Sequence, residues 1–159
     1  DSSLVLSIGA VGLSESDHPA ALLLTGDIAR VAMPEMLARG EIPRASVMKL
    51  PHHGSFIDES PAWLERVRPR LVLQSSGPER LRRDPWPRVL ERTGTSRLIT
   101  EHLGMIELSI GLGARGARQT GPRIVWTAFR DGWNTVPQRQ VKKVLTNPPS
   151  QLEKPGDRG

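Results

Sequence analysis

The sequence predicts an α/β layered domain with a mixed β-sheet, and two features of the chain support this prediction. Apolar, strand-like segments alternate with segments whose apolar residues recur at helical spacing along most of the 159 residues. Glycine and proline stand between these segments, where they end one element and turn the chain toward the next. No stretch approaches the roughly 20 apolar residues that a membrane-spanning helix needs.

The first third of the chain predicts two strands and a helix. Residues 3–8 alternate polar and apolar side chains, and residues 20–24 are a continuous apolar run, which predicts two strands joined by a turn-rich loop. Residues 28–39 carry apolar side chains at helical spacing, and Gly40 is placed to end this helix. Pro34 leaves the start of the helix open.

The alternation continues through the rest of the domain. Residues 47–50 predict a short buried strand. Ser60 is placed as a helix cap and Pro61 as a first-turn proline, and the helix that they begin must end before Pro69. The remaining segments predict a short helix over 87–92 and strands over 71–74, 97–100, 105–110 and 123–127.

The alternation fails from residue 134 onward, and the chain divides there. Residues 1–133 form the predicted domain. In residues 134–159, prolines interrupt a polar segment without periodicity, so we expect a largely disordered basic tail. The chain begins at Asp1 directly on a strand-like run, and we expect that upstream sequence is missing.

The composition limits the partners and the metal chemistry. The chain has 22 Lys and Arg against 17 Asp and Glu, a formal net charge of +5, which favours a polyanion without being diagnostic of one. It has no cysteine, which excludes a disulfide framework and a thiolate zinc site. A metal would therefore need imidazole and carboxylate ligands, and the histidines are His18, His52, His53 and His102.

Polar residues follow three successive predicted strands. Asp27 follows the first strand, the adjacent His52 and His53 follow the second, and Ser75 and Ser76 follow the third. In a layered α/β domain such strand ends lie along one edge and can converge. The sequence therefore predicts a site at this edge.

Each of these features has a simpler explanation as well. Asp27 is suited to cap a helix that starts at Ile28. The two histidines can be ordinary loop residues, and because adjacent side chains diverge, only one of them can normally bind a given metal. Ser75 and Ser76 can bind an anion or simply form a turn.

The motifs at these strand ends resemble those of a known family. The chain carries, in this order, LLLTGDI at 22–28, MKLPHHGS at 48–55, LVLQSSG at 71–77 and TEHLGMIEL at 100–108. Together they are similar to the metallo-β-lactamase domain at the C-terminus of ComEC-type competence proteins and to its stand-alone relatives. The resemblance implies a layered αββα fold with a mixed sheet, of which this chain would be the C-terminal half.

The resemblance also implies a metal-dependent hydrolase. Asp27 corresponds to the carboxylate that binds or bridges the metals, and His52 to the late metal-binding histidine. His53 and Ser55 would support these ligands or contact phosphate. A divalent metal, zinc or manganese, would activate water for attack on a phosphodiester. In ComEC proteins this activity is proposed to degrade the DNA strand that is not imported.

Further residues are candidates for contacts with the nucleic acid. Ser75 and Ser76 would bind substrate. Arginine's planar fork suits phosphate, so we expect Arg80, Arg82 and Arg83 to contact DNA, with a solvated basic face as the alternative.

The chain departs from the family pattern in two ways. The His-x-His-x-Asp-His run of the fold is absent, and in the family it lies upstream of where this chain begins. Asp84 stands where relatives carry a histidine before proline, and an aspartate there can still bind metal or act as a base. His18 and His102, in polar segments, are weaker site candidates.

Three functions are compatible with these residues. The first is the nuclease domain of a ComEC-like DNA-uptake protein, incomplete in this chain, with DNA, the missing N-terminal half and a membrane channel domain as partners. Such a domain would lie on the extracytoplasmic face of the cytoplasmic membrane, whereas a stand-alone relative would be cytoplasmic. The others are a non-catalytic module that binds nucleic acid or a partner, and a stand-alone metallo-hydrolase of small phosphoesters.

Overall fold

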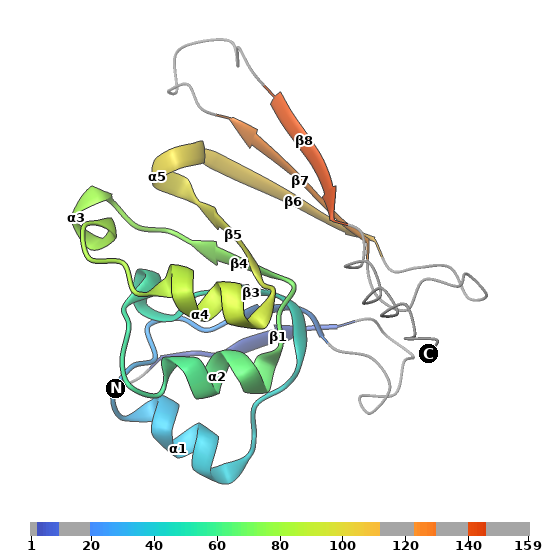
Figure 1. The fold of residues 1–159 in the computed structure, drawn as a ribbon. Coiled ribbons are helices and arrows are strands. Elements are labelled where there is room, and N and C mark those ends of the chain that lie inside the picture. Colours follow the sequence, from blue (N-terminus) through green and yellow to red (C-terminus); the bar gives the residue numbers. More distant parts are fainter. Residues whose placement is uncertain (1–2, 10–19, 112–122, 130–139, 146–159) are drawn as a thin grey trace, which may run out of the picture.

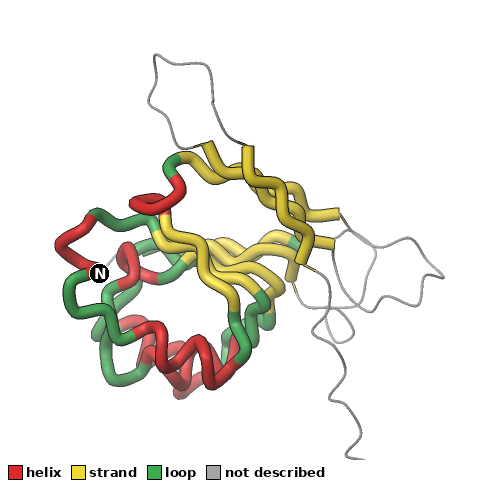
Figure 2. Tube along the Cα trace, turned by 45° about the horizontal axis from the view of Figure 1, so that its top comes forward, coloured by secondary structure: helices red, strands yellow, loops and turns green. Residues whose placement is uncertain are grey.

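The computed structural model describes residues 3–9, 20–111, 123–129 and 140–145, which form three layers. A five-stranded sheet lies in the middle, helices cover one of its faces, and a three-stranded sheet lies against the other (Figure 1). Figure 2 shows the two sheets stacked in yellow, with most of the helices, in red, on the outer side of the larger sheet. Within these described ranges, no helix is long and apolar enough to cross a membrane.

The central sheet is mixed, as the sequence predicts. The strand order is β1-β2-β3-β4-β5, in which β1 pairs antiparallel with β2 and the other neighbours are parallel. Because the four parallel strands run in the same direction, their carboxyl ends lie at one edge of the sheet. The strands are β1 (Leu6–Ile8), β2 (Ala20–Leu24), β3 (Ala45–Lys49), β4 (Leu71–Gln74) and β5 (Ser96–Ile99).

Three eight-residue helices connect the parallel strands and cover the same face of the sheet (Figure 1). They are α1 (Ala32–Arg39), α2 (Ser60–Val67) and α4 (Trp86–Thr93). Three shorter elements follow strand ends: the 3-10 turn η1 (Pro51–Gly54), α3 (Pro78–Leu81) and α5 (Thr100–Leu103). The polar residues of the predicted site stand in or beside these short elements.

Each face of the central sheet has its own apolar core. On the helical face, Met48 and Val72 pack with Trp63 of α2 and Trp86 of α4, and both tryptophans are almost fully buried. The Trp63 indole N–H also donates to the Met48 sulfur at 3.3 Å. Because aromatic side chains bury large areas, these two residues fix α2 and α4 against the sheet.

The second sheet is an antiparallel meander that covers the other face. Its strands are β6 (Met105–Gly111), β7 (Arg123–Phe129) and β8 (Gln140–Leu145), in that order. Ile124 and Trp126 on β7 pack against Val47 and Leu71 of the central sheet. The adjacent strand residues Val47 and Met48 thus serve opposite faces, as the pleat of a strand requires.

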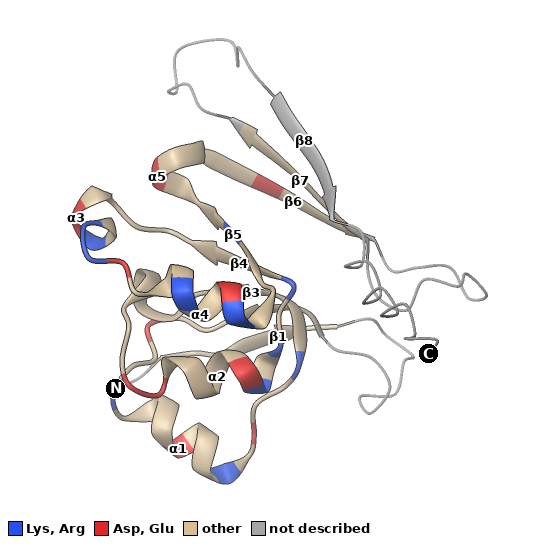
Figure 3. Ribbon diagram, viewed as in Figure 1, with Lys and Arg blue, Asp and Glu red and all other residues tan. Residues whose placement is uncertain are grey.

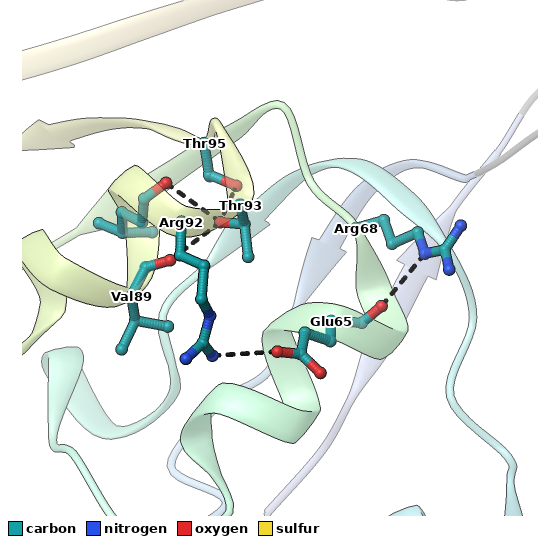
Figure 4. Close-up of polar contacts among 7 residues, drawn as sticks. Glu65, Arg68, Val89, Arg92, Thr93 and Thr95 are labelled. Carbon is teal, nitrogen blue, oxygen red and sulfur yellow. Dashed lines mark hydrogen bonds and ion pairs between the residues drawn. The ribbon is translucent and has the colours of Figure 1, made fainter.

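Figure 4 shows where α2 and α4 meet near the end of α4. Arg92 Nη2 of α4 lies 3.0 Å from Glu65 Oε1 of α2. The Thr93 hydroxyl lies 3.1 Å from the Leu90 carbonyl and 2.9 Å from the Thr95 hydroxyl. These contacts fix the last turn of α4 just before the chain enters β5.

The first helix begins later than the sequence predicts. Residues 28–39 are the predicted helix, whereas α1 begins at Ala32, and the Ile28 N–H bonds the Thr25 carbonyl in a turn. Pro34 explains the difference, because a residue without an N–H is tolerated only in the first helical turn. Asp27 is therefore no helix cap, since the cap position is Val31.

The segment expected to be a disordered tail contributes a strand. Gln140–Leu145 forms β8, which pairs antiparallel with β7 from Phe129↔Gln140 to Ile124↔Leu145. The rest of residues 134–159 lies outside the described residues. Pairing with β7 satisfies backbone groups that a single segment cannot satisfy alone, and the composition of the segment carries no signal of that pairing.

Candidate functional site

The polar residues that follow the parallel strands are brought to one edge of the central sheet. Asp27 follows β2, His52 and His53 follow β3, and Ser75 and Ser76 follow β4. All three strands are parallel neighbours, so the side chains predicted to converge do lie at a common edge. In Figure 1 this edge is the one where α3 and α5 stand.

The turn after β3 has an unusual backbone. His52 and His53 have φ angles of 44° and 56°, in the left-handed region that side chains other than glycine seldom adopt. This conformation costs about 1–2 kcal/mol per residue, so it persists only where its surroundings hold it. The His52 N–H donates to the Gly26 carbonyl at 3.0 Å, and the Trp86 indole N–H donates to the Gly54 carbonyl at 2.8 Å.

His53 and Asp27 face each other at this edge. The His53 Nδ1 lies 2.8 Å from the Ser75 carbonyl oxygen and donates to it, because a carbonyl only accepts hydrogen bonds. In the neutral imidazole the lone pair is then on Nε2, which lies 3.8 Å from Asp27 Oδ1. The His53 and Asp27 side chains are 51% and 57% exposed, so the pair is open to solvent.

This arrangement fits two ligands of one divalent cation. Zinc binds imidazole nitrogen and carboxylate oxygen at about 2.0–2.2 Å, so two donors on one ion lie about 4 Å apart or less. The 3.8 Å between Nε2 and Oδ1 falls within this limit. A hydrogen bond from the second ring nitrogen to a carbonyl is also typical of metal-binding histidines.

The donor set is partial among the described residues. A catalytic metal usually has at least three protein ligands. In the ranges that the structure describes, no three His, Asp or Glu side chains come together in a way that could hold an ion. Asp27 and His53 could supply two ligands, so an ion held between them would need further ligands.

The other histidines make no comparable contact with Asp27 in the described part of the chain. His52, the predicted metal ligand, is exposed, and of the two adjacent imidazoles it is His53 that faces Asp27. His52 as a ligand stays a prediction. His102 is exposed on α5, and His18 lies outside the described residues.

An open depression adjoins the Asp27–His53 pair. It has a volume of about 480 Å³, and its lining is mostly polar. Imidazole, hydroxyl and guanidinium groups of this kind suit an oxyanion, although one carboxylate also faces the space. The lining residues are His53, Ser75, Ser76, Gly77, Arg80, Thr100 and Glu101.

The arginines expected to contact phosphate have different surroundings. Arg80 lines the depression and donates to the Ser55 hydroxyl. Arg82 lies 2.9 Å from Glu79 within the same short segment, and Arg83 is exposed. Figure 3 shows basic and acidic residues side by side on α3. Of the three, Arg80 is the one placed beside the site.

Asp84 is held by other residues of the chain. Its Oδ2 lies 2.6 Å from Arg97 Nη1, and the side chains of Asp84 and Arg97 are only 12% and 15% exposed. The other carboxylate oxygen accepts from the Trp86 backbone N–H at 3.1 Å, at the start of α4. Both oxygens are therefore engaged, whereas the sequence predicted a metal ligand or a base here.

Three residues around the site were not singled out from the sequence. Trp86 holds the turn at Gly54, and Phe56 packs edge-on against it with ring centres 5.1 Å apart. Arg97 pairs with Asp84 and also donates to Gln74. The sequence held one signal of this network, the polar residue Gln74 at the end of an apolar strand. In the structure Gln74 is 1% exposed.

A comparison with known protein families, with characterised proteins and with solved structures finds no match for this chain.

Proposed function

We propose that this chain is part of a metal-dependent phosphodiesterase with the metallo-β-lactamase fold, of the kind found in ComEC-type DNA-uptake proteins. The observation that carries the proposal is the pairing of Asp27 with His53. The His53 ring is tethered through Nδ1 to the Ser75 carbonyl, and its free Nε2 lies 3.8 Å from the Asp27 carboxylate. This spacing and this tether support a role for the two residues as ligands of one ion.

The architecture supports the proposal. The helices, the mixed sheet and the second sheet would be three layers of the αββα sandwich that the motif resemblance implies. The paired residues stand at the carboxyl edge of parallel strands, where open α/β sheets bind their ligands.

Different residues of the chain would bind the metal and the substrate. Asp27 and His53 would hold zinc or manganese, and the bound ion would lower the pKa of its water and stabilise charge on phosphoryl oxygens. Arg80 and Ser76, which line the depression next to His53, would bind and orient the phosphodiester of DNA.

The remaining ligands would come from outside the described residues, and the N-terminal half of the same domain is the source that the resemblance implies. Among the described residues, β1 is an outer strand of the central sheet with one neighbour, and it offers a surface for additional chain. Leu4, Leu6 and Ile8, in and before β1, are 77%, 45% and 43% exposed. An exposed apolar edge strand of this kind is usually covered in a folded protein.

The test measures metal content and manganese- or zinc-dependent cleavage of single-stranded DNA by the natural full-length protein. We expect Asp27→Ala and His53→Ala to lose bound metal and cleavage together. His102→Ala, which removes an exposed imidazole outside this pair, is the matched control and should retain both. Metal binding and cleavage that survive in the Asp27 and His53 variants would rule the proposal out.

A second candidate is a non-catalytic module that binds nucleic acid, and the engagement of Asp84 by Arg97 favours it. A site that lacked this carboxylate would have fewer groups for holding an ion. The same experiment separates the two functions. Metal-free, inactive protein that binds DNA with an affinity falling steeply as salt rises would support the binding module.

A further inference from the structure

We propose that Asp84, Arg97 and Gln74 are positioning residues that hold the Ser76 hydroxyl as a hydrogen-bond donor to an anion bound in the depression. This inference deepens the proposed function and rests on it for the identity of that anion as a phosphoryl group. The network of these three residues and Ser76 spans β4, β5 and the loop before α4. It lies directly behind one wall of the depression, which Ser76 lines.

The first step is the placement of Arg97. Its Nη1 lies 2.6 Å from Asp84 Oδ2 and 3.0 Å from Gln74 Oε1. A guanidinium has only donors, so both oxygens accept from it. The Asp84 carboxylate balances the charge of Arg97, and the guanidinium is held between two acceptors with little exposure.

The second step is the orientation of the Gln74 amide. Because Oε1 accepts from Arg97, the amide nitrogen of Gln74 must point the other way. It lies 2.9 Å from the Ser76 Oγ and donates to it. Gln74 is 1% exposed, and a turned-over amide would set its own N–H groups against the donors of Arg97, so the hydrogen bonds fix its orientation.

The third step follows at Ser76. A serine hydroxyl has one proton and two lone pairs. Since Gln74 donates to the oxygen, the Ser76 proton is left for an acceptor in the depression. Arg80, which also lines the depression, donates to the Ser55 hydroxyl in the same manner.

The network therefore determines what the depression binds. A hydroxyl that already accepts a hydrogen bond favours a ligand rich in acceptors, and an oxyanion such as phosphate is the simplest of these. Arg80 also lines the depression and adds positive charge to it, beside the Glu101 carboxylate. The buried ion pair contributes orientation, because its own charges cancel.

The test is binding of inorganic phosphate to the natural full-length protein, followed by NMR chemical shifts or calorimetry in a double-mutant cycle. Gln74→Glu has the same shape but replaces the donor by an acceptor, so the Ser76 proton would turn away from the depression. We expect Gln74→Glu and Ser76→Ala each to weaken phosphate binding about tenfold. In the Ser76→Ala background, Gln74→Glu should weaken binding clearly less than tenfold, because only the repulsion from its added negative charge remains once the Ser76 hydroxyl is gone.

A control variant and a separate cleavage assay distinguish a loss of phosphate binding from a loss of folding or of hydrolysis. Ser76→Thr retains the hydroxyl and should restore binding to near the original affinity, which a purely structural role of residue 76 does not predict. Full phosphate affinity in Ser76→Ala, or equal losses from Gln74→Glu with and without Ser76, would overturn the inference, as would failure of the unaltered protein to bind phosphate. If the effects of Gln74→Glu and Ser76→Ala on phosphate binding are coupled but the unaltered protein shows no metal-dependent cleavage, the proposed function is rejected and this inference stands.

Discussion

Two pairs of a carboxylate with a basic side chain stand near the same edge of the central sheet, and they differ in almost every physical respect. In the Asp27–His53 pair the closest atoms are 3.8 Å apart, and about half of each side chain is exposed. In the Asp84–Arg97 pair they are 2.6 Å apart, and the side chains are 12% and 15% exposed. Both aspartates were predicted as metal ligands from the sequence, yet only Asp27 has a carboxylate that is open to a ligand.

The difference lies in what surrounds each carboxylate. Asp84 gives one oxygen to Arg97 and the other to the Trp86 backbone, so its capacity as an acceptor is used within the fold. Within the part of the chain that the structure describes, Asp27 faces an imidazole whose far nitrogen is already tethered to a carbonyl. A carboxylate that its neighbours orient but do not fully hydrogen-bond can still bind a ligand. A carboxylate whose oxygens are all hydrogen-bonded within the protein serves the structure.

The largest effect on stability should come from breaking the buried pair. Arg97→Ala leaves Asp84 and the Gln74 carbonyl without their shared donor, and removal of one partner of a buried pair costs about 3 kcal/mol. Urea unfolding would measure the loss. The Asp84→Ala/Arg97→Ala double variant should lose less than the sum of the single variants, whereas additive losses would show that the two residues do not act as a pair.

A smaller effect is expected at Gly54, where the turn of His53 meets the network of Arg97. Gly54 has φ +84°, and a Cβ there would lie 2.6 Å from the Gln74 amide nitrogen, so Gly54→Ala should destabilise the fold by about 2 kcal/mol. Gly77→Ala is the matched control, because a Cβ there meets nothing within 4 Å. Equal melting temperatures for the two variants would contradict the packing described.

The ion pair of Arg92 with Glu65 shows how little an exposed pair should contribute to stability beside the buried pair of Asp84 with Arg97 (Figure 4). Its atoms lie 3.0 Å apart, but the side chains are 61% and 58% exposed. Arg92→Ala should therefore cost no more than about 0.5–1 kcal/mol and less at high salt. A loss as large as that of Arg97→Ala would mean that exposure does not separate the two classes of pair.

The smallest effect on stability should come from the candidate site itself. Asp27→Ala removes an exposed carboxylate from a 3.8 Å contact, so the free energy of unfolding should change by no more than about 0.5 kcal/mol. Thermal unfolding without added metal would measure it. A strongly destabilised Asp27→Ala protein would place Asp27 with Asp84 among the structural residues.

Several elements were predicted within a residue or two, because their signals are local. The apolar runs at 20–24 and 71–74 coincide with β2 and β4, and the helix after Ser60 ends before Pro69 as expected. Caps, prolines and periodicity act on neighbouring residues, so a single sequence contains them. The start of α1 was missed by four residues because the position of Pro34 within the helical turn was left open.

The sequence by itself determined the α/β class, the mixed sheet and the order in which polar residues follow the strands, because these depend on short-range patterns. Only the tertiary structure decided which of those residues meet. The register of β4 and β5 brings Arg97 to Gln74, and through it to Asp84, while the left-handed turn after β3 brings His53 to Asp27. Such contacts depend on strand pairing and burial between residues far apart in the sequence. They give Asp27 and Asp84 different surroundings, although the sequence predicts both as possible metal ligands.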